Sequence, residues 1–335
     1  MILHPGILAL LIGSLLTLLL MLKACWLGLQ IIWRWDMTSS SETQLLLERK
    51  TWLVSTLLNY ALSFQILSGV LYLYTLEDIH RLFVGAMCAT GALNANLVGW
   101  LVLVVKVVLF FAAALWVIFN QLDQRTEDTP LVRPKYLALI LITPLVALDL
   151  YLQFNYFSGL QPEIITSCCG SLFSADGQSV ASELAGMPAG ESMKIFFSVI
   201  SAFFILLVSC FFSRSSIPRI LLFVATVLTF FASLAAVVSF ISLYIYQMPS
   251  HHCPFDMLQG HYNYIGYPLY AGLFVGTLFG LLPGLCQPLR RRDSLRREID
   301  LLEKRWLTIS LLGMLTFLII AGWPMVFGPF ILLGY

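Results

Sequence analysis

Residues 306–335, WLTISLLGMLTFLIIAGWPMVFGPFILLGY, contain no charged side chain, and residues 51–76, TWLVSTLLNYALSFQILSGVLYLYTL, contain none either. A helix of about 20 predominantly apolar residues spans the hydrocarbon core of a bilayer. Both stretches exceed that length, so each predicts a transmembrane helix.

Six further stretches are long and apolar enough to cross a membrane. We therefore predict about eight spans, which cover residues 6–30, 52–75, 98–119, 136–157, 195–213, 220–247, 264–287 and 307–332. The run Leu15-Leu16-Thr17-Leu18-Leu19-Leu20 is apolar on every side, whereas strands of a membrane β-barrel alternate apolar and polar residues. The first span lacks a basic segment before it and a small-residue cleavage site, so we expect a retained helix rather than a signal peptide.

The composition supports the same fold class. Hydrophobic residues make up 59% and charged residues 11% of the 335 residues, whereas a soluble domain carries about 25% charged residues. We expect one all-α transmembrane domain, residues 1–335, which forms a polytopic helical bundle in the lipid bilayer. The net charge of +1 leaves no basic surface, so no nucleic-acid partner is predicted.

Basic residues are concentrated in alternate loops, which predicts an orientation. The opposite loops carry only Arg81 and Lys194. Since basic loops stay in the cytoplasm, we predict a multi-pass protein of the inner (cytoplasmic) membrane with both termini outside the cytoplasm. The residues of the basic loops are Arg34, Arg49, Lys50, Arg125, Arg133, Lys135, Arg214, Arg219, Arg290, Arg291, Arg292, Arg296, Arg297, Lys304 and Arg305.

Two of the basic loops place leucines at helical spacing among charges, at 41–50 and 290–305. Such segments either extend a spanning helix or lie in the membrane interface and dock a partner. A cytoplasmic ATPase, or another subunit of a membrane complex, would need such a segment as its docking site. The stretch LLERKTWL (46–53) resembles LLEKRWL (301–307), and this similarity hints at duplicated helical hairpins.

Cysteine and histidine show a one-sided distribution. Cys25, Cys210 and Cys286 lie near the inner ends of spans, where free cysteine packs as a small apolar residue. We expect the outer loops to form a small cap that gathers the remaining cysteines and every histidine. Those residues are Cys88, Cys168, Cys169, Cys253, His4, His80, His251, His252 and His261.

Three chemistries remain open for this set, and the first is a soft-metal site. Thiolate, imidazole and thioether ligands select copper(I), zinc or an iron centre. None of the spacings matches the C-x₂-C pattern of a zinc module. The candidate ligands are Cys88, Cys168, Cys169, His251, His252, Cys253 and Met257.

The second chemistry is thiol–disulfide exchange, with Cys88, Cys168, Cys169 and Cys253 as the catalytic residues. The stretch from Cys253 to Asp256 holds only the first half of a C-x-x-C motif, but a relay can run through mixed disulfides with the vicinal pair. The third is purely structural. Four cysteines allow three connectivities of two disulfides, and one of the options joins Cys88 to Cys253.

Two further groups of residues are candidates. Tyr262, Tyr264 and Tyr267 form either an aromatic belt at the membrane surface or a floor for a quinone, a haem or another organic ligand beside the last cysteine. Lys106 and Asp149 lie at similar depth in neighbouring spans. They form either an ion pair that carries protons for redox chemistry or, if the lysine snorkels to the interface, no pair.

Walker A, C-x-x-C-H, G-x-S-x-G and H-E-x-x-H signatures are absent from the sequence, so whether the chain is an enzyme stays open. We hypothesise a membrane protein of redox or soft-metal handling, with a Cys/His site on the extracytoplasmic face. The alternative is a permease or assembly subunit whose outer cysteines are structural disulfides.

Overall fold

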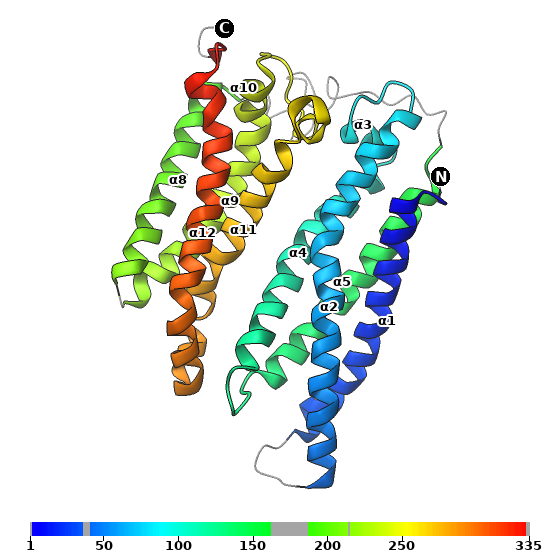
Figure 1. Cartoon of the computed structure of the whole chain (residues 1–335), viewed down its shortest axis with the longest axis vertical. Coiled ribbons are helices and arrows are strands. Elements are labelled where there is room, and N and C mark those ends of the chain that lie inside the picture. The colour runs from blue at the N-terminus through cyan, green and yellow to red at the C-terminus, as the bar shows by residue number, and fades with distance from the viewer. Residues whose placement is uncertain (1, 36–40, 162–186, 214, 333–335) are drawn as a thin grey trace. The chain divides into compact units, whose positions relative to one another are not determined.

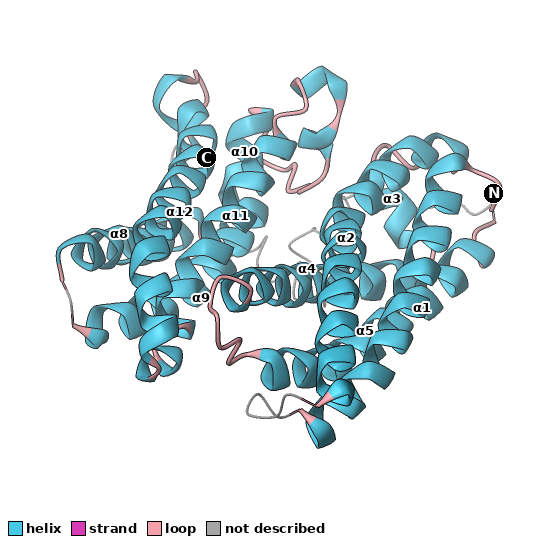
Figure 2. Ribbon diagram, turned by 60° about the horizontal axis from the view of Figure 1, so that its bottom comes forward, coloured by secondary structure: helices cyan, strands magenta, loops and turns pink. Residues whose placement is uncertain are grey.

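A computed structural model describes residues 2–35, 41–161, 187–213 and 215–332 (Figure 1). These residues are helical with connecting loops and contain no strand (Figure 2). Eight helical segments within them are long and apolar enough to cross a membrane, which confirms the predicted number of spans. The chain divides into two compact units, residues 1–84 with 92–165 and residues 85–91 with 166–335. A single transmembrane domain stays a prediction.

The first unit is a four-helix bundle. Each helix packs against the next one in sequence, and the last packs against the first. Leu58, Leu62, Trp116 and Tyr136 belong to its buried core. The long helices are α1 (Pro5–Arg34), α2 (Glu42–Ile79), α4 (Val98–Asp123) and α5 (Val132–Ser158). Between α2 and α4 the chain forms η1 (His80–Leu82) and α3 (Ala89–Asn94), and the first residues of α3 belong to the second unit.

The second unit has the same cyclic order of helix contacts. One of its spans is interrupted by a π-helical turn, η2, and its longest loop carries two 3₁₀ turns, η3 and η4. Its elements are α8 (Ala189–Phe212), α9 (Ser216–Ala236), η2 (Val237–Ile241), α10 (Ser242–Tyr246), η3 (Asp256–Leu258), η4 (Gly260–Tyr262), α11 (Gly266–Leu285), η5 (Pro288–Arg291) and α12 (Asp293–Phe327).

The two charged segments with helical leucine spacing are helix extensions. Residues 42–50 are the first turns of α2, and residues 293–305 are the first turns of α12. Ser41 caps α2, because its side-chain oxygen accepts a hydrogen bond from the backbone N–H of Gln44. A docking role for these extensions stays a prediction.

Glycines allow α11 and α12 to approach each other closely. Gly272, Gly276, Gly280 and Gly284 recur at four-residue intervals along α11, a spacing that lets helix backbones touch in membranes. A Cβ atom built on Gly313 of α12 would lie 2.7 Å from the backbone nitrogen of Gly276 and 2.9 Å from the carbonyl oxygen of Gly272. Backbone atoms cannot rotate away, so a side chain here would push the two helices apart.

We expect Gly313→Ala to lower the free energy of unfolding by about 1–3 kcal/mol, the usual cost of overpacking. Gly322→Ala, in the same helix, is the matched control, because a Cβ atom there meets no described atom within 4 Å. Denaturation of both variants in mixed micelles measures the difference. Equal stability of the two variants would contradict the close packing of α11 on α12.

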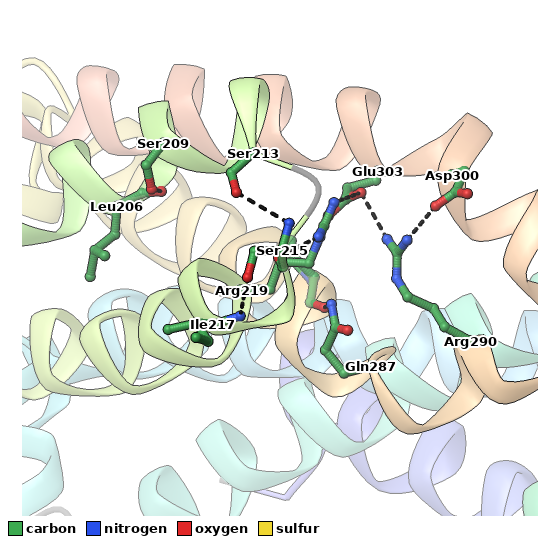
Figure 3. A network of polar contacts seen from close by, with 11 residues as sticks. Leu206, Ser209, Ser213, Ser215, Ile217, Arg219, Gln287, Arg290, Asp300 and Glu303 are labelled. Atoms are coloured by element: carbon green, nitrogen blue, oxygen red, sulfur yellow. Dashed lines mark hydrogen bonds and ion pairs between the residues drawn. The ribbon is translucent and has the colours of Figure 1, made fainter.

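A buried ion-pair network joins α9, η5 and α12 (Figure 3). Glu303 accepts hydrogen bonds from Nε and Nη2 of Arg219, and from Nη2 of Arg290 at 2.8 Å. Arg290 also pairs with Asp300, whose side chain is 52% exposed. The sequence assigns both arginines to basic loops. In the structure the carboxylate of Glu303 pairs with both and offsets the cost of removing their charges from water.

Glu303→Gln should destabilise the protein by about 3–5 kcal/mol, because it leaves the buried guanidinium of Arg219 without a counter-charge and removes one of the two carboxylates that pair with Arg290. Asp300→Asn should cost about 0–1 kcal/mol, since the pair it breaks is exposed. The midpoint of thermal unfolding in detergent compares the two. A larger loss from Asp300→Asn would show that the network is not centred on Glu303.

Candidate functional site

Two loops of the second unit bring Cys88 and Cys253 together. Their sulfur atoms lie 3.5 Å apart, and both residues are fully buried. Cys88 belongs to the segment 85–91, which packs with the second unit although it follows α2 in sequence. The side chain of Gln259 holds this segment in place by donating a hydrogen bond to the carbonyl oxygen of Met87 at 2.7 Å.

Asp256 completes a set of three donor groups. One oxygen of its carboxylate and the two sulfur atoms all lie within 4.8 Å of one another. The 3₁₀ turn η3 begins at Asp256 and folds the carboxylate back towards Cys253. Oδ2 contacts Nε2 of His251, whereas Oδ1 is buried and accepts no hydrogen bond from any described residue. The set therefore offers two sulfurs and one carboxylate oxygen, and one oxygen of this carboxylate accepts no hydrogen bond from a described residue.

Hydrogen bonds fix the backbone around Cys253. The hydroxyl of Tyr246 donates to the carbonyl oxygen of Cys253 at 2.7 Å and accepts from the backbone N–H of Met257 at 2.9 Å. The hydroxyl of Tyr270 donates to the carbonyl oxygen of Pro254 at 2.6 Å. A rigid loop keeps the sulfur in one position, which is what a metal ligand or an exchanging thiol requires.

The sulfur of Cys253 also receives polar contacts. The Thr90 hydroxyl lies 3.3 Å from it, and the backbone N–H of Phe255 donates to it at 3.5 Å. These contacts help to hold the sulfur in position. The thiolate is the form of cysteine that binds metals and attacks disulfides.

The structure does not gather every predicted site residue. His252 bonds through Nδ1 to the carbonyl oxygen of Val238 at 2.9 Å and lies outside the close donor set. His251 reaches the set only through Asp256. Met257 is buried, and its backbone N–H bonds to Tyr246. Cys168 and Cys169 lie outside the described residues, so their place in the site stays a prediction.

The three tyrosines make aromatic contacts in the second unit, and their role as a floor for an organic ligand stays a prediction. Tyr262 packs on Tyr246, with ring centroids 4.8 Å apart, whereas Tyr264 and Tyr267 pack on each other at 6.3 Å. Burial raises the pKa of the Tyr262 phenol, and the charges of Asp256 and Cys253 raise it further. Tyr262 therefore lies near the donor set as a protonated phenol.

Lys106 and Asp149 lie together in the first unit. Lys106 Nζ is 2.8 Å from Asp149 Oδ2, and both side chains are almost completely buried. The lysine therefore does not snorkel. Ser68 accepts a second hydrogen bond from Lys106 at 3.0 Å, and the amide of Gln65 donates to the same carboxylate oxygen at 2.9 Å.

Asp123 and Lys135 form a second buried pair that sequence reasoning missed. Lys135 Nζ lies 2.7 Å from Asp123 Oδ2, and Asp123 Oδ1 accepts from the backbone N–H of Leu131 at 2.7 Å. Lys135 also donates to Asn120 at 2.9 Å. The pair closes the turn between α4 and α5. Its sequence signal is the presence of opposite charges on the two sides of one short loop.

Comparison with known proteins adds no assignment to this geometry. The chain matches no protein family, no curated protein and no solved structure.

A variant whose only cysteines are Cys88 and Cys253 should form an intramolecular disulfide under mild oxidation in the presence of a chelator. The two sulfur atoms need to approach each other by only about 1.5 Å to reach the bond length of about 2.05 Å. Loss of both maleimide-reactive thiols, together with loss of two hydrogens by mass spectrometry, measures the reaction.

The matched control retains only Cys253 and Cys286. Cys253 precedes the N-terminus of α11, and Cys286 follows its C-terminus. That 20-residue helix spans about 30 Å, so no intramolecular bond is expected. Cross-linking of neither variant would show that Cys88 and Cys253 are not neighbours.

Proposed function

We propose that this chain is a multi-pass membrane protein that handles a metal ion of the zinc type, held by Cys88, Cys253 and Asp256. The observation that carries the proposal is the convergence of two buried sulfurs and one carboxylate oxygen within 4.8 Å. Buried polar groups are normally satisfied by a partner. A cation satisfies two thiolates and a carboxylate at once.

The spacing of the sulfur atoms fits a tetrahedral metal better than a disulfide. Two sulfurs bound to zinc at about 2.3 Å with tetrahedral angles lie about 3.8 Å apart. The separation of Cys88 and Cys253 is 3.5 Å, close to that value and well beyond the disulfide bond length of about 2.05 Å.

The chemistry of the donors favours zinc over the other candidate cofactors. Zinc accepts sulfur, nitrogen and oxygen ligands in one site, whereas copper(I) selects soft thiolate and thioether ligands. An iron–sulfur cluster needs about four ligands of the cysteine type. A quinone would need an aromatic surface, whereas the donor set consists of two sulfurs and a carboxylate.

His251 acts in this proposal as an outer partner of the site. It contacts Asp256 Oδ2 and so fixes the orientation of the carboxylate, in the way that carboxylate and imidazole groups support each other around zinc. Three protein ligands leave a fourth position for water or for a ligand supplied by another molecule. Such an open position suits metal transfer.

The distribution of loop charges supports a location for the site. The loops with Cys88 and Cys253 alternate with the strongly basic loops, which the positive-inside rule places in the cytoplasm. We infer that the metal site faces the extracytoplasmic side of the inner membrane. A bound metal would also protect the thiols there, where an oxidising environment drives cysteines to pair.

A thiol–disulfide relay is the second candidate function, and the proximity of the two sulfurs favours it. In this reaction the thiols of Cys88 and Cys253 form one disulfide, and two electrons and two protons pass to an acceptor such as a quinone. Cys168 and Cys169 would then be the exchange partners through a mixed disulfide.

The purified full-length chain, prepared without chelator, should contain zinc in stoichiometric amount by elemental analysis. Cys88→Ser and Cys253→Ser should each remove it, because each deletes a thiolate ligand. His251→Ala should weaken zinc binding by about 10–100-fold, as expected for loss of an outer partner. Competition with a zinc-binding dye measures the affinity.

Cys210→Ser is the matched control, because Cys210 is buried in the same unit but lies outside the donor set. It should retain zinc. Protein without metal would contradict the zinc proposal. If such protein also held a Cys88–Cys253 disulfide that a reduced quinone could open, the relay would be the function instead.

A further inference from the structure

The first unit contains a buried polar cluster between four spanning helices. α1 provides Ser14, α2 provides Gln65 and Ser68, α4 provides Lys106, and α5 provides Asp149 and Gln153. Each of these residues is at most 2% exposed. Polar residues inside a membrane bundle are costly and generally have a function.

Hydrogen bonds in the cluster converge on a single oxygen atom. Asp149 Oδ2 accepts from Lys106 Nζ at 2.8 Å, from Gln65 Nε2 at 2.9 Å and from Gln153 Nε2 at 2.7 Å. Gln153 Nε2 also donates to the Ser14 hydroxyl at 3.2 Å. The strong donors of the cluster are therefore directed at one side of the carboxylate.

Three acceptor oxygens remain. Asp149 Oδ1, Gln65 Oε1 and Gln153 Oε1 are buried and have no hydrogen-bond partner in the described part of the chain. The oxygen and nitrogen of one amide are about 2.3 Å apart, so both amide oxygens lie within about 5 Å of Asp149 Oδ2. Rotating either amide by 180° would turn an oxygen towards the carboxylate and leave the nitrogen without an acceptor.

The other buried pair in the same bundle shows what a purely structural carboxylate looks like. Both oxygens of Asp123 accept hydrogen bonds, one from Lys135 and one from the backbone of Leu131. No described side-chain atom of that pair lacks a partner. Of these two buried lysine–aspartate pairs, only the one at Asp149 has buried acceptor atoms without a described partner.

We propose that the cluster around Asp149 binds one hard monovalent cation of the sodium class, in exchange for the proton of Lys106. Asp149 Oδ1 and the two glutamine carbonyl oxygens are ligands of the kind that hard cations prefer. With Lys106 protonated, the site is neutral. An added cation would leave a net positive charge in a low-dielectric interior, so it enters as the lysine loses its proton.

The exchange balances in charge and atoms. The ammonium of Lys106 gives one proton to solvent and becomes an amine, while the sodium ion takes over as the counter-ion of Asp149. A divalent ion would leave an excess charge even after this exchange. The site therefore couples one sodium ion to one proton, which is the elementary step of ion-coupled transport.

The other titratable groups near the cluster are held as neutral hydrogen-bond donors. The hydroxyl of Tyr72 on α2 donates to the carbonyl oxygen of Gly99, and the hydroxyl of Tyr156 on α5 donates to that of Ala92. The residue that α1 contributes to the cluster is Ser14, which carries a hydroxyl, and the residue that α4 contributes is Lys106 itself. The exchangeable proton is thus assigned to Lys106.

Sodium chloride titrated into the full-length protein in weakly buffered detergent solution should release about one proton per chain in a saturable manner, as a pH indicator dye records. Choline chloride at the same ionic strength should release none. Elemental analysis of chelator-treated protein verifies that the zinc site does not contribute.

Three variants separate the roles. Lys106→Met should abolish proton release and bind sodium at least tenfold more tightly, because no internal cation competes. Asp149→Asn should weaken sodium binding at least 30-fold. Gln153→Met keeps the ion pair, and hence the fold, but removes one ligand, so it should weaken sodium binding about tenfold. Sodium-dependent thermal stabilisation measures binding in each variant.

Asp123→Asn is the control for a buried carboxylate in the same bundle and should keep the sodium response of the unaltered chain. The proposal is overturned if sodium and choline act alike on the unaltered protein. It is also overturned if a folded Lys106→Met variant still releases a proton, or if folded Gln153→Met binds sodium as tightly as the unaltered chain.

Discussion

In the interior of a helical bundle that is shielded from water, polar side chains can form hydrogen bonds only with other groups of the protein. This constraint determines how the buried polar residues of this protein are arranged. Apolar residues cover most of each spanning helix, so burial of a charge requires a counter-charge. Glu303 meets this need for two arginines, and Asp123 meets it for Lys135. These contacts join different helices and stabilise each bundle.

The same constraint distinguishes structural carboxylates from candidate binding groups. Asp123 uses both oxygens within the protein. Asp149 and Asp256 each use one, and each has a second buried oxygen that no described residue binds. At Asp256 the neighbours are thiols, which suits a borderline metal. At Asp149 they are amide oxygens, which suits a hard monovalent ion. Donor chemistry thus assigns two different ligands to two similar groups.

The sequence predicts the spans well because an uninterrupted apolar run has few alternatives. It also offers contact between Lys106 and Asp149 as one of two alternatives, since their depths match, and the structure shows that contact. It misses the ion pairs that Lys135 forms with Asp123 and that Arg219 forms with Glu303. A basic residue at the end of a span fits a loop equally well. The proximity of Cys88 to Cys253 depends on a segment between α2 and α4 that packs with the second unit, which no local pattern encodes.

Zinc-edge X-ray absorption of the purified protein reports which atoms surround the metal, and so tests whether Cys88 and Cys253 bind it. We expect two sulfur neighbours at about 2.3 Å, with lighter atoms at about 2.0–2.2 Å completing the shell. A first shell of nitrogen and oxygen atoms alone would contradict it, since Cys88 and Cys253 would then not be the ligands.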